Sequence, residues 1–173
     1  MSMLRSFVLV AAVAIVAGPI ARAQEPVKPG PEHDMLKKWE GTWDVTMKME
    51  GTEAKGTSTF KMELGGLWLA SALDIELFGT KFAGKGMDTY DAKKKKFVSI
   101  WCDSMSTSPM ILEGTYDKET KKLTMSGDAP GPDGKIQKHK TVTEWKDENT
   151  ATFAMYMGDG KDPMFTVTYK RKK

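Results

Sequence analysis

The chain has 173 residues, with 26 lysines and arginines against 23 aspartates and glutamates, and a single cysteine. The length fits one ordinary domain, and the nearly balanced charge excludes a dedicated nucleic-acid binder, which would carry a clustered basic excess. One cysteine excludes an intrachain disulfide framework, and also a zinc site that needs two thiolates from this chain. With 40% hydrophobic and 28% charged residues, the composition is that of a globular protein.

Residues 1–23 have the features of a signal peptide. Arg5 precedes an uncharged run over residues 7–17, a glycine and a proline end that run, and Ala21 and Ala23 form an A-x-A cleavage site. The run is too short to span a bilayer, so we expect no membrane span after cleavage and a periplasmic or secreted location. An uncleaved anchor is the alternative. Removing these 23 residues, with their two arginines, leaves 150 residues and a formal charge of +1, which argues against a charged partner.

Residues 24–31 contain three prolines and a glycine, which is typical of an extended leader. Residues 32–173 are predicted to form the domain. Within it, 32–40 is the one plausible helix, because Leu36 and Trp39 are three apart and share a face. We expect this short helix to cap the domain.

After the helix, apolar and polar residues alternate with a period of two, and polar turns recur about every ten residues. Trp43, Val45 and Met47, for example, alternate with Asp44 and Thr46. The pattern predicts ten strands, at residues 43–50, 57–64, 67–77, 82–90, 97–103, 110–116, 122–128, 136–146, 151–157 and 164–171.

Ten sequential strands joined by short turns predict an all-β fold with an antiparallel up-and-down topology. An open sheet of that size would expose two edges and a large apolar face, and closing it into a barrel removes both problems. A barrel of ten strands is wide enough to hold a small ligand or to need bulky side chains filling it. A β-sandwich is the alternative, whereas the absence of long segments with a 3.6-residue period excludes helical and α/β folds.

Gly41-Thr42-Trp43, which opens the first strand after a short helix, resembles the G-x-W pattern of lipocalins and fatty-acid-binding barrels. The resemblance implies that Trp43 closes one barrel end beneath a basic side chain from the last strand. Arg171, the only arginine after residue 23, stands at the end of the last predicted strand. Antiparallel closure would bring that position beside Trp43, so we predict a cation–π or stacked pair.

A wider resemblance covers most of the chain after residue 30. The segments with Gly41-Thr42-Trp43, with Gly84-Lys85-Gly86 before Tyr90-Asp91, and with Trp101-Cys102-Asp103-Ser104 are similar to the bacterial domain-of-unknown-function family 1579, a lipocalin-like group. The resemblance implies a barrel and supplies no known reaction. The chain departs from the more distant haem-binding nitrobindin barrels, because no proximal-histidine motif can be placed in it.

His139 is the most prominent candidate site residue. Lys138, Lys140 and Glu144 share one parity of their strand and are expected to face water, which turns His139 and Thr141 toward the lumen. An imidazole in a cavity could ligate haem iron or another metal, or act as an acid or base. A hydrogen-bonded histidine without a ligand is the plainer interpretation.

We therefore predict that the lumen binds a small apolar or amphipathic molecule. The alternatives are a haem or metal protein using His139, and a structural barrel filled by its own side chains. No catalytic set of acid, base and nucleophile is visible, so the sequence does not predict an enzyme. It assigns no metal site and no cofactor, with haem at His139 as the alternative. The predicted lumen residues are Trp43, Met47, Phe60, Met62, Trp101, Leu112, His139, Thr141 and Trp145.

Four further features allow a plain and a functional interpretation. Asp103 lies beside Ser104, but no histidine is near in sequence, so turn formation is favoured over catalysis. His33 is expected to be structural. The pairs Met47-x-Met49 and Met155-x-Met157 could bind Cu(I) through thioethers or fill an irregular core. Cys102 is expected to be a buried thiol on the face opposite Trp101.

Overall fold

The computed structural model describes residues 25–173. The predicted signal peptide lies outside the described residues. Helix α1 spans Pro31–Lys37, and a 3-10 turn, η1, spans Leu64–Gly66. The strands are β1 (Gly41–Met49), β2 (Thr52–Glu63), β3 (Trp68–Leu77), β4 (Thr80–Asp91), β5 (Lys96–Asp103), β6 (Met110–Asp117), β7 (Lys122–Pro130), β8 (Ile136–Trp145), β9 (Thr150–Met157) and β10 (Phe165–Arg171).

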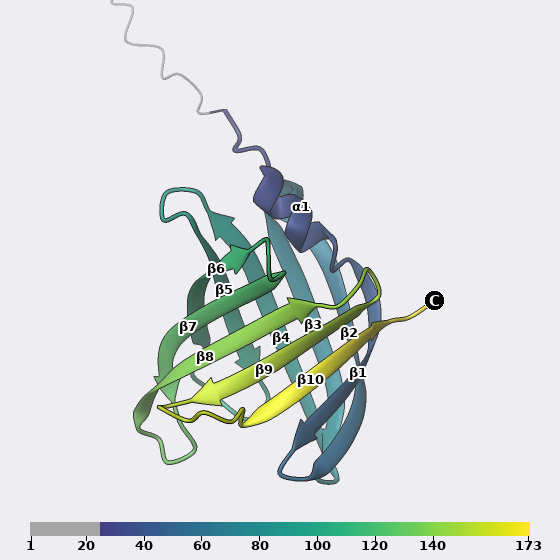
Figure 1. Cartoon of the computed structure of the whole chain (residues 1–173), viewed down its shortest axis with the longest axis vertical. Helices are drawn as coiled ribbons and strands as arrows, with labels where there is room; N and C mark the ends of the chain where they lie inside the picture. Colours follow the sequence, from purple (N-terminus) through teal and green to yellow (C-terminus); the bar gives the residue numbers. More distant parts are fainter. Residues whose placement is uncertain (1–24) are drawn as a thin grey trace, which may run out of the picture.

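The strands form one closed barrel in which each strand pairs antiparallel with its neighbours in sequence. The closure joins β1 to β10, with a register that runs from Trp43 opposite Arg171 to Lys48 opposite Thr166. Figure 1 shows the yellow β10 beside the blue β1, so the two ends of the domain's chain meet along this seam. The predicted up-and-down barrel is confirmed, and the sandwich alternative is excluded.

Strand β2 begins five residues earlier than predicted, at Thr52. Ala54 is the one apolar side chain in residues 52–56, so the segment shows no alternation, but its backbone pairs with β1 as far as Met49 opposite Thr52. Glu50 and Gly51, both with positive φ, make the tight hairpin turn. Backbone pairing therefore extends this hairpin beyond the part that the hydrophobic pattern marks.

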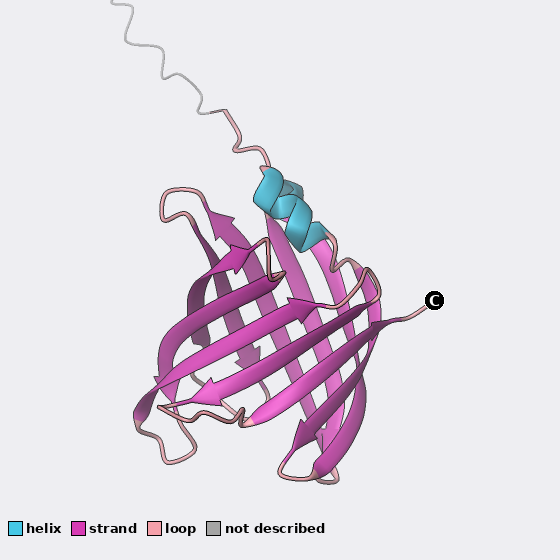
Figure 2. Ribbon diagram, viewed as in Figure 1, coloured by secondary structure: helices cyan, strands magenta, loops and turns pink. Residues whose placement is uncertain are grey.

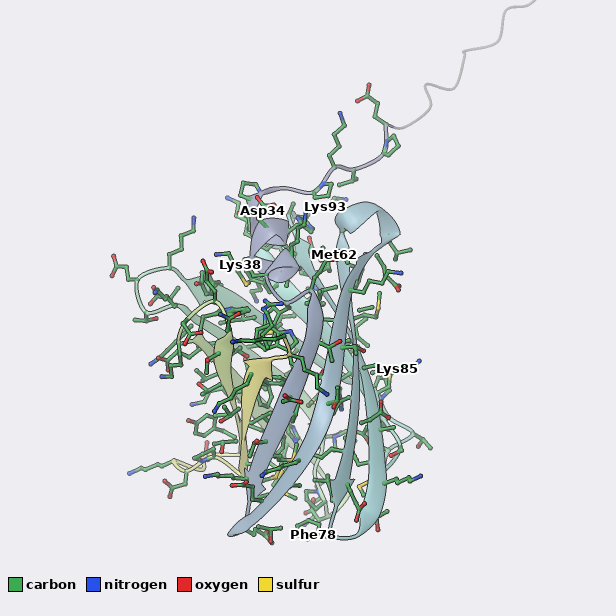
Figure 3. The ribbon with its side chains drawn as sticks, turned by 90° about the vertical axis from the view of Figure 1, so that its right-hand side faces the viewer. Asp34, Lys38, Met62, Phe78, Lys85 and Lys93 are labelled. Carbon is green, nitrogen blue, oxygen red and sulfur yellow. The ribbon has the colours of Figure 1, made fainter. Side chains whose placement is uncertain are left out.

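Helix α1 lies across one end of the barrel (Figure 2), where it contacts β2, β3 and β4. Gly30 is its N-cap, a proline follows in the first turn, and Glu32 and Asp34 place negative charge near the helix N-terminus. In Figure 3, Met62 at the end of β2 lies close to α1, whereas Phe78 in the β3–β4 turn marks the opposite end. We call these the helix end and the mouth end.

The buried side chains form two clusters along the barrel axis. At the helix end, Met35 and Leu36 of α1 and Trp39 pack against Trp43 and Phe97. Toward the mouth end, Val45 and Met47 pack with side chains of β3 and β10. Space remains between the barrel walls beside these two clusters, and the candidate site lies in that space.

Candidate functional site

The lumen holds a cavity of about 690 Å³. Leu36 and Trp39 form its floor at the helix end, and its walls continue to residues of the β5–β6, β7–β8 and β9–β10 loops. Met105 and Met164 line the cavity and are 64% and 36% exposed. The cavity is therefore accessible to solvent at the mouth end.

Methionine dominates the wall of this cavity. Eight of the eleven methionines after residue 23 line it: Met47, Met49, Met105, Met110, Met125, Met155, Met157 and Met164. Both methionine pairs of the sequence are among them, because residues two apart on a strand share a face. Unbranched thioether side chains adapt to irregular shapes and suit a wall that contacts ligands of variable outline.

The structure places six predicted lumen residues on the cavity wall, namely Met47, Phe60, Trp101, Leu112, His139 and Thr141. They come from β1, β2, β5, β6 and β8, so the lumen brings together side chains far apart in sequence. Alternation within each strand was the signal that pointed to them.

Trp43, Met62 and Trp145 do not line this cavity. Trp39, at the helix end, covers both Trp43 and Trp145. Its ring centroid lies 5.2 Å from that of Trp43 and 4.5 Å from that of Trp145. Met62 packs against the same cluster, and its backbone N–H donates to the Glu40 carboxylate at 3.0 Å. These three inward-facing residues close the helix end, because the chain before β1 folds back over them.

Arg171 lies over Trp43, the arrangement that its position in the sequence predicts. Its guanidinium carbon is 4.2 Å from the Trp43 ring centroid. The two terminal nitrogens donate hydrogen bonds of 2.5 Å to the carbonyl oxygens of Glu40 and Lys38. Gly41 has a φ of +118°, and a Cβ there would lie 3.2 Å from Arg171 Nη1. Gly41 therefore supplies both the turn into β1 and room for the arginine.

The Gly84-Lys85-Gly86 segment makes room for Trp101. A Cβ at Gly84 would lie 2.1 Å from the Trp101 indole, and one at Gly86 would lie 3.3 Å from it. The indole Nε1–H donates to Asp103 at 3.0 Å, and Asp103 also accepts from the backbone N–H of Met105 at 2.9 Å. The two family motifs thus meet in space, where they hold one tryptophan flat in the cavity wall. The turn role expected for Asp103 is part of this arrangement.

His139 is 6% exposed and lines the cavity on β8, directly opposite Met157 of β9. Its Nδ1 is 3.0 Å from the carbonyl oxygen of Gln137. A carbonyl can only accept, so Nδ1 donates this hydrogen bond, and in the neutral imidazole the lone pair is then on Nε2. His33, in contrast, lies in α1, where its Nδ1 accepts from the Gly30 backbone N–H at 3.0 Å.

Three polar residues of the cavity wall were not predicted from the sequence. Asp88 on β4 and Ser99 on β5 are register partners, and both line the cavity with Tyr169 of β10. Burial raises the pKa of Asp88 to about 6, against the opposing effect of a hydrogen bond from Ser99. Burial and then the Asp88 carboxyl raise the pKa of Tyr169. The parity shared by Phe82, Asp88 and Tyr90 was the signal available.

Two further observations concern metals and thiols. Within residues 25–173, no group of three or more His, Cys, Asp or Glu side chains could hold a metal ion. Cys102 is exposed, so the expected buried thiol is wrong. Trp101 occupies the inward position, and the next residue on the strand must point outward.

No helix in the described part of the chain is long and apolar enough to cross a bilayer.

A closed ten-stranded barrel with a helix over one end and a lumenal cavity defines a lipocalin-like barrel. The chain belongs to the family described as protein of unknown function (DUF1579), whose model matches residues 28–171. Comparison with curated proteins gives no match.

Solved structures similar to the chain include two redesigned beta barrels, each bound to DFHBI. The barrel mFAP0 is 16% identical with a TM-score of 0.45, over 78% of this chain and 99% of that one. The barrel mFAP1 is 18% identical with a TM-score of 0.43, over 79% of this chain and 97% of that one.

Proposed function

We propose that this protein is exported and binds a small apolar or amphipathic molecule in its lumen. The observation that carries the proposal is the cavity of about 690 Å³, within the size range of small-molecule sites. Its wall is mainly apolar with a few polar groups, among them Asp88, His139 and Thr141, which is the composition of such sites. A barrel filled by its own side chains would leave no space of this size, so the cavity favours the ligand-binding alternative.

Replacing Thr141 with tryptophan is expected to weaken lumenal binding at least about tenfold, because the indole would occupy the space that a ligand needs. Thr141 is 3% exposed and stands on the cavity wall, opposite Met155. The measurement is a fluorescence titration of the purified protein with Nile red, an uncharged apolar dye.

The matched control is Lys138→Trp, which adds the same side chain at an exposed, outward-facing position of the same strand. This variant should bind the dye like the original chain. Equal affinity in all three proteins, each shown to be folded by its thermal transition, would place the dye outside the lumen and contradict the proposal.

A second candidate function, haem or metal binding through His139, has one specific observation in its favour. The hydrogen bond from Nδ1 to the Gln137 carbonyl leaves Nε2 as the nitrogen with a lone pair, and such an outer hydrogen bond is usual for ligating histidines. The thioether of Met157, the register partner of His139, is a soft donor on the same wall.

Hemin titration of the purified protein tests this second candidate. If His139 is the ligand, His139→Ala should abolish the Soret shift that the original chain gives, whereas Met157→Leu should change its position or intensity. A Soret shift that is the same in the original chain and in His139→Ala would reject His139 as the iron ligand.

A further inference from the structure

The cavity wall carries negative and neutral polar groups but no fixed positive charge. Its carboxyl groups belong to Asp88 and Asp103, and within residues 25–173 no lysine or arginine lines it. A barrel that held the carboxylate of a fatty acid would need a cationic or strongly donating partner for it. The charge pattern therefore disfavours an anionic ligand.

The two carboxyl groups differ in the hydrogen bonds that they already make. Asp103 accepts hydrogen bonds from Trp101 Nε1 and from the Met105 backbone N–H, so each of its two oxygens already has a partner within the protein. Asp88 accepts from the Ser99 hydroxyl and has neutral groups of β3, Leu69 and Ser71, beside it. A carboxylate offers about four acceptor sites, so Asp88 keeps acceptor capacity directed at the lumen.

Aromatic rings surround the lumen near its floor. Trp39, Phe60 and Tyr169 line the cavity there, and the Trp39 ring centroid lies 5.0 Å from that of Phe60 and 5.2 Å from that of Tyr169. Burial and then the charge of Asp88 raise the pKa of Tyr169, so this ring lies within electrostatic range of the carboxylate. Aromatic faces beside a carboxylate attract organic ammonium groups, through the ring quadrupole and through the ion pair.

We infer that the lumen selects amphiphiles with a protonated amine, whose head group pairs with Asp88 near the floor while the apolar tail lies along the methionine-lined wall toward the mouth. The inference rests on the proposed lumenal binding and names the ligand class for that site. The pairing compensates the desolvation of the buried carboxylate, which is otherwise without a cationic partner on the cavity wall among residues 25–173.

Three probes that share one tail separate the head-group preference from tail binding: n-decylammonium, n-decanol and n-decanoate. Each probe is tested for its ability to displace Nile red from the purified protein at pH 7.5, at concentrations below its critical micelle concentration. We expect decylammonium to bind at least about tenfold more tightly than decanol, and decanoate to bind most weakly. Asp88→Asn should reduce the affinity for decylammonium to that for decanol, with both probes measured on the same variant.

Asp74→Asn is the matched control, because Asp74 is an exposed, outward-facing carboxylate on the neighbouring strand β3. It should keep the preference for decylammonium. Equal affinities for decanol and decylammonium, or a preference for decanoate, would overturn the inference while leaving lumenal binding intact. Failure of all three probes and of Nile red to bind would overturn the proposed function as well.

A pH profile of the unmodified protein tests the same inference without a substitution in the site. The preference for decylammonium should shrink as the pH falls from 7.5 to 5, because the pKa of Asp88 is about 6 and the protonated form offers no charge. The other titratable groups on the cavity wall are Asp103, His139 and Tyr169, and Tyr90 follows on β4. In His139→Gln, the preference for decylammonium should still shrink over the same pH range, because Asp88 is unchanged. A preference for decylammonium that does not depend on pH in the unmodified protein would contradict a role for Asp88.

Discussion

Replacing Arg171 with alanine is expected to lower the free energy of unfolding by about 3.5 kcal/mol, the lower end of the combined size of two hydrogen bonds to a charged group and one cation–π contact. The guanidinium donates to the carbonyls of Lys38 and Glu40 and covers Trp43. Lys38 is the C-cap of α1, so Arg171 satisfies one carbonyl group that the helix leaves unpaired, and Glu40 follows two residues later. The same side chain thereby fastens the helix, the first strand and the last strand together. Urea unfolding followed by tryptophan fluorescence measures the change.

Two further variants separate the fork-shaped head group from its charge. Arg171→Lys keeps the charge but lacks the planar fork that points two separate nitrogens at the two carbonyls, so about half of the loss is expected. Lys172→Ala removes only an exposed ion pair, 3.3 Å from Lys172 Nζ to the Asp44 carboxylate, and should change the stability by less than about 0.5 kcal/mol. An alanine variant at Arg171 as stable as the one at Lys172 would show that the closure contact contributes nothing to folding.

The closure pair was predictable from the sequence because it depends on strand order. Once ten antiparallel strands close, the start of the first must lie beside the end of the last, and Trp43 and Arg171 occupy those two places. The alternation of side chains in the same way predicts that His139 faces inward. Both expectations follow from periodicity and connectivity, and neither needs side-chain packing.

The boundary between filled and empty lumen was not predictable, because it depends on packing in three dimensions. Inward parity alone cannot separate Trp145, which lies under Trp39 at the closed end, from Thr141, which lines the cavity four residues earlier on the same strand. The helix covers one end only, and that asymmetry decides which inward-facing residues reach open space. Asp88 lies within the predicted strand 82–90, but it was not predicted to line the lumen, because Gly84 and Gly86 share its parity and no run of apolar side chains marks that face as the inward one.

The variant Asp88→Asn is expected to gain stability over the original chain as the pH rises from 4 to 7. The pKa of Asp88 is about 6 in the folded protein and about 3.9 in an unfolded chain. At a pH below the pKa of the unfolded chain, the Asp88 carboxyl is protonated in both the folded and the unfolded state, and the folded protein keeps its full stability. Between the two values, the folded state holds more protons than the unfolded state, so stability is lost with rising pH. The loss approaches about 3 kcal/mol, and water that enters the lumen reduces it.

Urea unfolding of both proteins at pH 4, 5, 6 and 7 measures this effect, because the titrations of all other groups cancel in the difference between the two. The difference should be smallest at pH 4 and should grow through pH 6. A bound ammonium amphiphile that pairs with Asp88 would stabilise its ionised form and remove the loss in the original chain. A difference that does not vary with pH would mean that Asp88 is fully hydrated, and the same hydration would weaken the case for an ion pair in the lumen.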